Sequence, residues 1–329
     1  MALSTQSIQW KPRKQGGTGQ ALLLVHGIGN AAAGDYTFLL PHVKAALGAK
    51  AENVAVYSLY YDAINDWFKT KTDLEAAIGS LKKWLGAQYG GIVANVAAEV
   101  VADVFWPILS SSAREAIQTA YLAQLQRLVL DGIDAGFPPD YQKISIVCHS
   151  LGCFHTYEAL HRCVNDASQH LHPVADGVRF KSVVFMASPV QMIRTVADAI
   201  SFFVHDGLAV LKKEGLSGPV ALTPSGTPVS LVEKWVSLTG ALDPVGGHLF
   251  RHKLDWAYMN VPARNGFKGQ DSKIDAQDWL NVQTEAELRD CLMSVLSTRQ
   301  AGQIPLNDPH SWGDYIKRHT AELEGLLCV

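Results

Sequence analysis

The feature that most constrains the fold is a β-branched run that ends at a serine. Residues 143–152 read KISIVCHSLG, and residues 153–162 that follow have helical spacing. A strand that stops at Ser150 and passes directly into a helix makes a sharp turn that exposes the serine hydroxyl. The same turn points the N-terminus of the helix at the group that the hydroxyl attacks. The segment differs from Gly-x-Ser-x-Gly only at Cys148, which is small enough for the close approach of strand and helix. It therefore predicts a nucleophilic serine in a strand–turn–helix.

The rest of the chain alternates short apolar runs with segments of helical spacing. Strand-like runs are 21–25, 53–61, 182–187, 234–240 and 255–261, and helical segments are 41–47, 73–85, 113–132, 190–213, 276–298 and 311–327. This alternation predicts an α/β fold, in which a mostly parallel sheet is covered by helices on both faces. Because the chain has no repeats and no low-complexity linker, we expect a single domain over residues 1–329. Helical insertions at about 66–132 and 190–229 are expected to form a cap or lid.

Composition and charge exclude several classes of protein. The chain has 329 residues, of which 48% are hydrophobic and 18% charged, so a large core is expected and global disorder is not. The net charge of −3 gives no reason to expect a nucleic-acid partner. Residues 90–109 are apolar but contain Glu99 and Asp103, so we expect a buried or cap helix there and not a membrane span.

The cysteines and the N-terminus bear on the compartment. The five cysteines include no Cys-x-x-Cys pair, and a bridge between Cys148 and Cys153 would distort the serine turn. Free thiols in a reducing compartment are therefore expected. Residues 1–20 lack the apolar core of a signal peptide. The prediction is a cytoplasmic location.

A serine hydroxyl needs a base to accept its proton, and an acid orients that base. In this architecture the chain order is serine, acid, histidine. Asp243 follows the predicted strand at 235–238 directly, and Pro244 stops that strand. The alternative is a turn aspartate before proline, and the rival acids are Asp206 and Asp255. We predict Asp243 as the orienting acid.

Twelve histidines are candidates for the base. His310 lies in the turn-rich sequence NDPHSWGDY at 307–315, which opens the final helical segment. The last catalytic loop is expected there, although a capping or surface histidine is the alternative. His248 and His252 are the reserve candidates; they rank below His310 because they follow Asp243 too closely to leave room for a separate strand. We predict His310 as the base.

When a serine attacks a carbonyl carbon, a tetrahedral intermediate with a negatively charged oxygen forms. This oxygen needs backbone N–H groups directed at it. The residue after the nucleophile, Leu151, is expected to supply one. The loop HGIG at 26–29 follows the first strand, and its glycines free the backbone to turn the N–H of Ile28 toward the pocket. We take His26 as a structural hydrogen-bonding residue of this loop.

The sequences HGIGN, CHSLG, DPV and NDPHSWGDY, in this order, resemble the α/β-hydrolase superfamily. They are most similar to lipase- and esterase-like members with a plain His-Gly oxyanion loop. The resemblance implies the α/β-hydrolase fold, with Ser150 as nucleophile, Asp243 as acid, His310 as base, and Ile28 and Leu151 as oxyanion donors. It implies hydrolysis of carboxylic esters through an acyl-enzyme, with no cofactor and no metal ion. The expected partners are a small-molecule or lipid-like ester and, transiently, a lipid interface.

Other interpretations remain open or are disfavoured by particular residues. Ser150 argues against the superfamily members that place aspartate or cysteine at the same turn. A thioesterase, amidase or peptidase would use the same triad, and a hydrolase fold can also serve as a non-catalytic binding protein. The apolar segment 190–213 is either a core-packed helix or a lid over an apolar acyl site, which would favour esters with apolar acyl chains.

Overall fold

The structure is a computed structural model. It describes residues 4–14, 16–27, 40–61, 64, 111–165, 177–190, 219–222, 225–240, 271–275, 312, 315–316 and 319–327. Asp243, His310 and Ile28 lie outside these residues. So do the predicted helices at 73–85 and 276–298, the predicted strand at 255–261 and all but the first residue of 190–213.

A seven-stranded sheet forms the centre of the described structure. In spatial order its strands are β1 (Ser4–Ile8), β3 (Val54–Leu59), β2 (Gly19–Val25), β4 (Gln142–His149), β5 (Phe180–Met186), β8 (Val232–Gly240) and β9 (Asp271–Asp275). The five strands from β3 to β8 are parallel, and β1 and β9 pair antiparallel at the two edges. This confirms the predicted α/β fold with a mostly parallel sheet.

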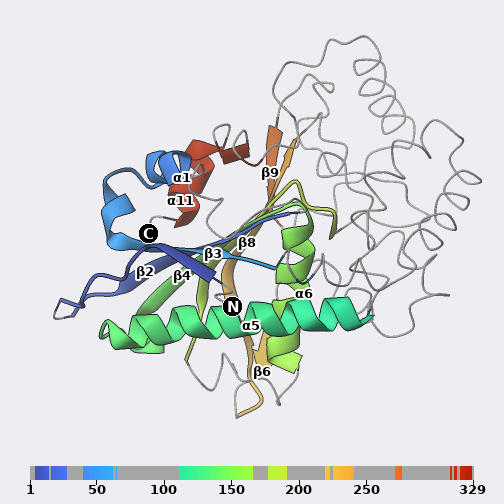
Figure 1. Ribbon diagram of the computed structural model, residues 1–329, viewed down its shortest axis with the longest axis horizontal. Helices are drawn as coiled ribbons and strands as arrows, with labels where there is room; N and C mark the ends of the chain where they lie inside the picture. Colours follow the sequence, from blue (N-terminus) through green and yellow to red (C-terminus); the bar gives the residue numbers. More distant parts are fainter. Residues whose placement is uncertain are drawn as a thin grey trace, which may run out of the picture.

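Helices cover both faces of the sheet, as the buried strands require (Figure 1). They are α1 (Leu40–Leu47), α5 (Ser111–Asp134), α6 (Leu151–Asn165) and α11 (Thr320–Leu327). Successive residues of β2 point to opposite faces. Leu23 and Val25 pack in the cluster that contains α5 and α6, whereas Leu22 and Leu24 pack in the cluster that contains α1 and α11.

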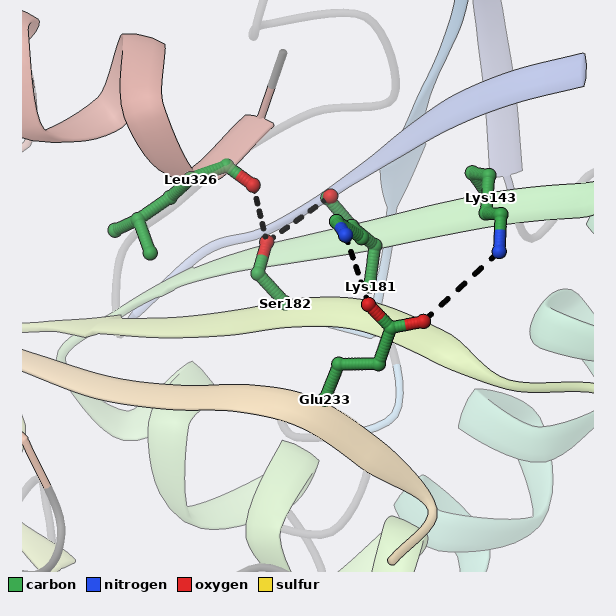
Figure 2. Close-up of polar contacts among 6 residues, drawn as sticks. Lys143, Lys181, Ser182, Glu233 and Leu326 are labelled. Carbon is green, nitrogen blue, oxygen red and sulfur yellow. Dashed lines mark hydrogen bonds and ion pairs between the residues drawn. The ribbon is translucent and has the colours of Figure 1, made fainter. Parts of the chain in front are cut away.

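Helix α11 is tied to the middle of the sheet by a hydrogen-bonded serine pair (Figure 2). The Ser182 hydroxyl on β5 donates to the carbonyl oxygen of Leu326 at 3.2 Å and shares a hydrogen bond with the Ser145 hydroxyl of β4 at 3.0 Å. Nearby, Glu233 of β8 forms ion pairs with Lys181 at 2.8 Å and Lys143 at 3.9 Å. The serine pair fixes the C-terminal helix beside the two strands that carry the candidate site.

The strands expected from apolar runs are present wherever the structure describes the chain, but some polar elements were missed. The predicted strands at 21–25, 53–61, 182–187 and 234–240 correspond to β2, β3, β5 and β8. The sequence did not predict β1 or β9, nor the hairpin of β6 (Val220–Leu222) and β7 (Pro228–Ser230), which lies where a connection was expected. Short 3-10 helices at Gly48–Asn53 and Pro139–Tyr141 were also missed.

The predicted cap insertions fall mostly outside the described residues. Within the segment at 66–132, α5 packs on the sheet, and Ile117, Tyr121 and Leu125 are fully buried in the core between α5 and the sheet.

Among the described helices, none has the length and apolar character needed to cross a membrane.

Candidate active site

Ser150 lies at the single-residue junction between β4 and α6, as the sequence predicted. Its φ is +52°, a left-handed conformation that costs a non-glycine residue about 1–3 kcal/mol and is concentrated at functional sites. The Ser150 N–H donates to the carbonyl oxygen of Met186 at 2.9 Å, and its own carbonyl oxygen accepts from the N–H of Cys153 at 3.0 Å. The neighbouring strand and the first turn of α6 therefore hold the serine in this strained conformation.

Two glycines explain how closely the chain passes around Ser150. A Cβ on Gly152 would collide with the backbone carbonyl oxygens of His26 and Val25, so the first turn of α6 presses against the end of β2. A Cβ on Gly27 would lie 2.5 Å from the Ser150 Cβ and 3.1 Å from its Oγ. The loop after β2, which the sequence assigned to the oxyanion site, thus lies directly against the serine side chain.

Cys148 occupies the position of the missing first glycine. It is fully buried in the core cluster on the α6 face, and Cys148, Cys153 and Cys163 are free thiols. Burial raises the pKa of Cys153 well above its usual range and that of Cys163 to about 12. These two thiols are therefore protonated at neutral pH, and a protonated thiol is a weak nucleophile.

His26 is a buried, neutral member of the loop. Its Nδ1 lies 2.6 Å from the carbonyl oxygen of Gly27, which can only accept, so Nδ1 carries the proton. Burial lowers the pKa of His26 to about 4, against a smaller opposing effect of this hydrogen bond. The ring stacks on Tyr61 with centroids 4.2 Å apart. His26 therefore binds its own loop, as the structural interpretation predicted.

The remaining described histidines near the serine are engaged in packing. His155, on α6, is fully buried, and burial, followed by the nearby His26 and Arg114, lowers its pKa to about 3. His149, the residue before Ser150, stacks on Trp312 with ring centroids 5.7 Å apart and an interplanar angle of 9°. Tyr315 meets the same imidazole edge-on at 6.3 Å.

The structure brings some of the predicted site residues together and does not describe others. Ser150 and Leu151 form the junction, and Leu151 is the first residue of α6, whose initial N–H groups have no acceptor within the helix. Ile28 would follow Gly27, Asp243 is three residues beyond the end of β8, and His310 is two residues before Trp312. The rivals His248, His252, Asp206 and Asp255 also lie outside the described residues.

Two residues of the site were missed by sequence reasoning. Tyr61 packs on His26 and donates its hydroxyl to the loop, and Trp312 covers His149. Both contacts join segments that are far apart in the chain, so no local sequence pattern predicts them. The available signal was the aromatic pair Tyr60-Tyr61 at the end of the strand-like run 53–61.

Comparison of the sequence with models of known protein families and with curated proteins finds no match.

Proposed function

We propose that the protein is a serine hydrolase that cleaves carboxylic esters through an acyl-enzyme, as in lipase- and esterase-like α/β-hydrolases. The observation that carries the proposal is the conformation of Ser150. It is a left-handed serine between a central parallel strand and a helix, in contact with a glycine of the neighbouring loop. Residues in such strained conformations are concentrated at functional sites, and here the strained residue carries a hydroxyl that can act as a nucleophile.

The positions of the described neighbours support His310 and Asp243 as partners of Ser150. The carboxyl ends of β4 and β8 lie at one edge of the sheet, separated only by β5, which is about 10 Å across two strand spacings. Asp243 follows the end of β8 by three residues, a reach of at most about 11 Å. Trp312 stacks on His149, the residue before Ser150, and His310 is separated from Trp312 by at most about 7 Å of extended chain.

In the proposed reaction, the Ser150 Oγ attacks the ester carbonyl carbon while His310 takes its proton and Asp243 holds the imidazole. The carbonyl oxygen becomes an oxyanion that accepts from the N–H groups of Ile28 and Leu151. The carbon–oxygen bond to the alcohol then breaks, and His310 returns the proton to the leaving alcohol. Water repeats the cycle, releases the carboxylic acid and restores Ser150.

The first test is hydrolysis of p-nitrophenyl esters of increasing acyl length. We expect Ser150→Ala to lower kcat at least about 10⁴-fold, since removal of the nucleophile of a triad has effects of this order or larger. Ser188→Ala is the matched control, because Ser188 is also buried and follows the neighbouring strand β5. Turnover by Ser150→Ala at the wild-type rate would overturn the proposal.

The same assay separates the candidate partners and substrates. His310→Ala should abolish turnover, whereas a loss confined to His248→Ala or His252→Ala would move the base to that residue. Asp243→Asn should lower kcat by about 10⁴-fold, as does the loss of an orienting aspartate in a known triad. A rate that rises with acyl length supports apolar esters, and a flat response excludes them. Thioesters, amides and peptides in the panel test the other reactions open to this triad.

A further inference from the structure

The loop that carries Gly27 is held from behind by the side chain of Tyr61. The two residues are at equivalent places after neighbouring strands. Val25, the last residue of β2, is in register with Leu59, the last residue of β3, and Gly27 and Tyr61 each follow the end of their own strand by two residues. The Tyr61 hydroxyl lies 2.7 Å from the carbonyl oxygen of His26 and 3.0 Å from that of Gly27. Tyr61 is itself fully buried.

The ring of Tyr61 is fixed on two sides, so its hydroxyl has little freedom. One face stacks on His26 at 4.2 Å with an interplanar angle of 7°, and the ring of His155 meets it at 4.8 Å and 72°. The Gly27 carbonyl oxygen also accepts from His26 Nδ1 at 2.6 Å. The single hydroxyl proton of Tyr61 is shared between the His26 and Gly27 oxygens, so the Gly27 oxygen accepts from both Tyr61 and His26 Nδ1.

Fixing this carbonyl has a consequence for the proposed oxyanion site. In a trans peptide the C=O and the following N–H point in opposite directions. A Gly27 carbonyl oxygen that is held by Tyr61 and His26 therefore also fixes the plane of the peptide that follows Gly27. Gly27 also packs against Ser150. A Cβ atom placed on Gly27 would lie only 2.5 Å from the Cβ of Ser150. The peptide that is locked by Tyr61 is thus the one beside the nucleophile.

We propose that Tyr61 is a positioning residue of the oxyanion hole: its hydroxyl locks the Gly27 carbonyl so that the N–H of Ile28 is preorganised for the tetrahedral intermediate. The inference rests on the proposed function, because it assigns a task to Tyr61 within the reaction of Ser150. Tyr61 does not touch substrate in this account. It acts through the peptide that follows Gly27, and its contribution is confined to the transition state.

The test is Tyr61→Phe, which deletes one oxygen atom and keeps the ring stack. Loss of a whole oxyanion donor costs about 10²- to 10³-fold in kcat, so a donor that is present but misoriented should cost about 10- to 100-fold. KM for a p-nitrophenyl ester should stay within about twofold, since the ester substrate binds before the oxyanion forms. A trifluoromethyl ketone with the same acyl chain forms a tetrahedral adduct on the serine, and its affinity should fall in parallel with kcat.

Tyr121→Phe is the matched control. Tyr121 is also fully buried, and its hydroxyl donates to the Thr156 hydroxyl of α6 at 3.0 Å. We expect Tyr121→Phe to keep the wild-type kcat and ketone affinity, and amide hydrogen exchange in residues 26–30 to increase only in Tyr61→Phe. Equal kinetics for the two variants, or a Tyr61→Phe loss in KM alone, would overturn the proposal while leaving the hydrolase assignment intact. A wild-type protein that neither hydrolyses esters nor binds the ketone would remove both.

Discussion

Ser150 and Ala187 share an unusual backbone conformation, with φ of +52° at both residues. They follow the ends of the adjacent strands β4 and β5, and each N–H continues the ladder to the next strand, to Met186 at 2.9 Å and to Leu238 at 3.4 Å. The sequence indicated that Ser150 would occupy a sharp turn. It contained no signal for the matching turn at Ala187, where neither glycine nor asparagine marks a left-handed residue.

The strain at Ser150 predicts an ordering of two inactive variants. Glycine adopts a positive φ without the steric cost of a Cβ, so Ser150→Gly should unfold with a free energy about 1 kcal/mol higher than Ser150→Ala. Urea unfolding of the two proteins measures the difference. At Ser188, whose φ is not positive, the order should reverse because glycine gains more backbone entropy on unfolding. A Ser150→Gly protein less stable than Ser150→Ala would contradict the inferred strain.

Among the helices and strands, those marked by a continuous apolar run in the sequence were the ones that could be predicted. Strands buried on both faces, such as β2 with Leu22 to Val25, read as continuous apolar runs and were found. The edge strands β1 (STQSI) and β9 (DSKID) each pair with a single neighbour and carry polar or charged residues, so no such run marks them. The serine turn was found because a strand and a helix with strong patterns meet there without an intervening loop.

The stack of Trp312 on His149 predicts that the C-terminal segment supports the site. Removing this ring with Trp312→Ala should lower kcat about 10- to 100-fold, because small displacements of catalytic groups have effects of this size. Leu326→Ala is the control. Leu326 is buried in the same cluster on α11, and its truncation should cost about 2–5 kcal/mol of stability without disturbing the stack. Kinetics at a temperature where both variants are folded decide the matter, and equal kcat values would show that the stack has no part in catalysis.

Across the whole molecule, the interface of α5 and α6 holds buried ionisable groups whose effects on stability oppose each other. Glu158 accepts from Gln118 and lies 3.4 Å from Arg114, yet burial outweighs these partners and raises its pKa to about 8. Its contribution to stability is fully present below pH 4.5 and is lost progressively as the pH rises from there to about 8. His155 behaves oppositely, since burial lowers its pKa to about 3. Sequence reasoning placed His155 on the helix but could not foresee its burial, because its ring packs against Tyr61, which is far away in the sequence.

His155 predicts a specific loss of stability in acid. Below pH 6.5 the unfolded chain takes up a proton at this histidine that the folded protein excludes until about pH 3. Stability is therefore fully present above pH 6.5 and falls by about 2 kcal/mol at pH 5 from this group alone. Between pH 7.5 and 5, the free energy of unfolding of His155→Leu, measured by urea titration, should fall by about 2 kcal/mol less than that of the wild type. Leu125→Ala, a non-titrating change in the same core, should keep the wild-type pH dependence. A His155→Leu protein with an unchanged pH dependence would contradict the buried, neutral imidazole.

The central claim is that the strained serine at the end of β4 is a nucleophile. Labelling with a fluorophosphonate probe, followed by mass spectrometry of the peptides, tests it most directly, because such probes react covalently with activated serines and need no knowledge of the substrate. We predict one adduct on Ser150 in the wild type and in Ser188→Ala, and none in Ser150→Ala. Absence of labelling in the wild type, or equal labelling of wild type and Ser150→Ala, would contradict the account.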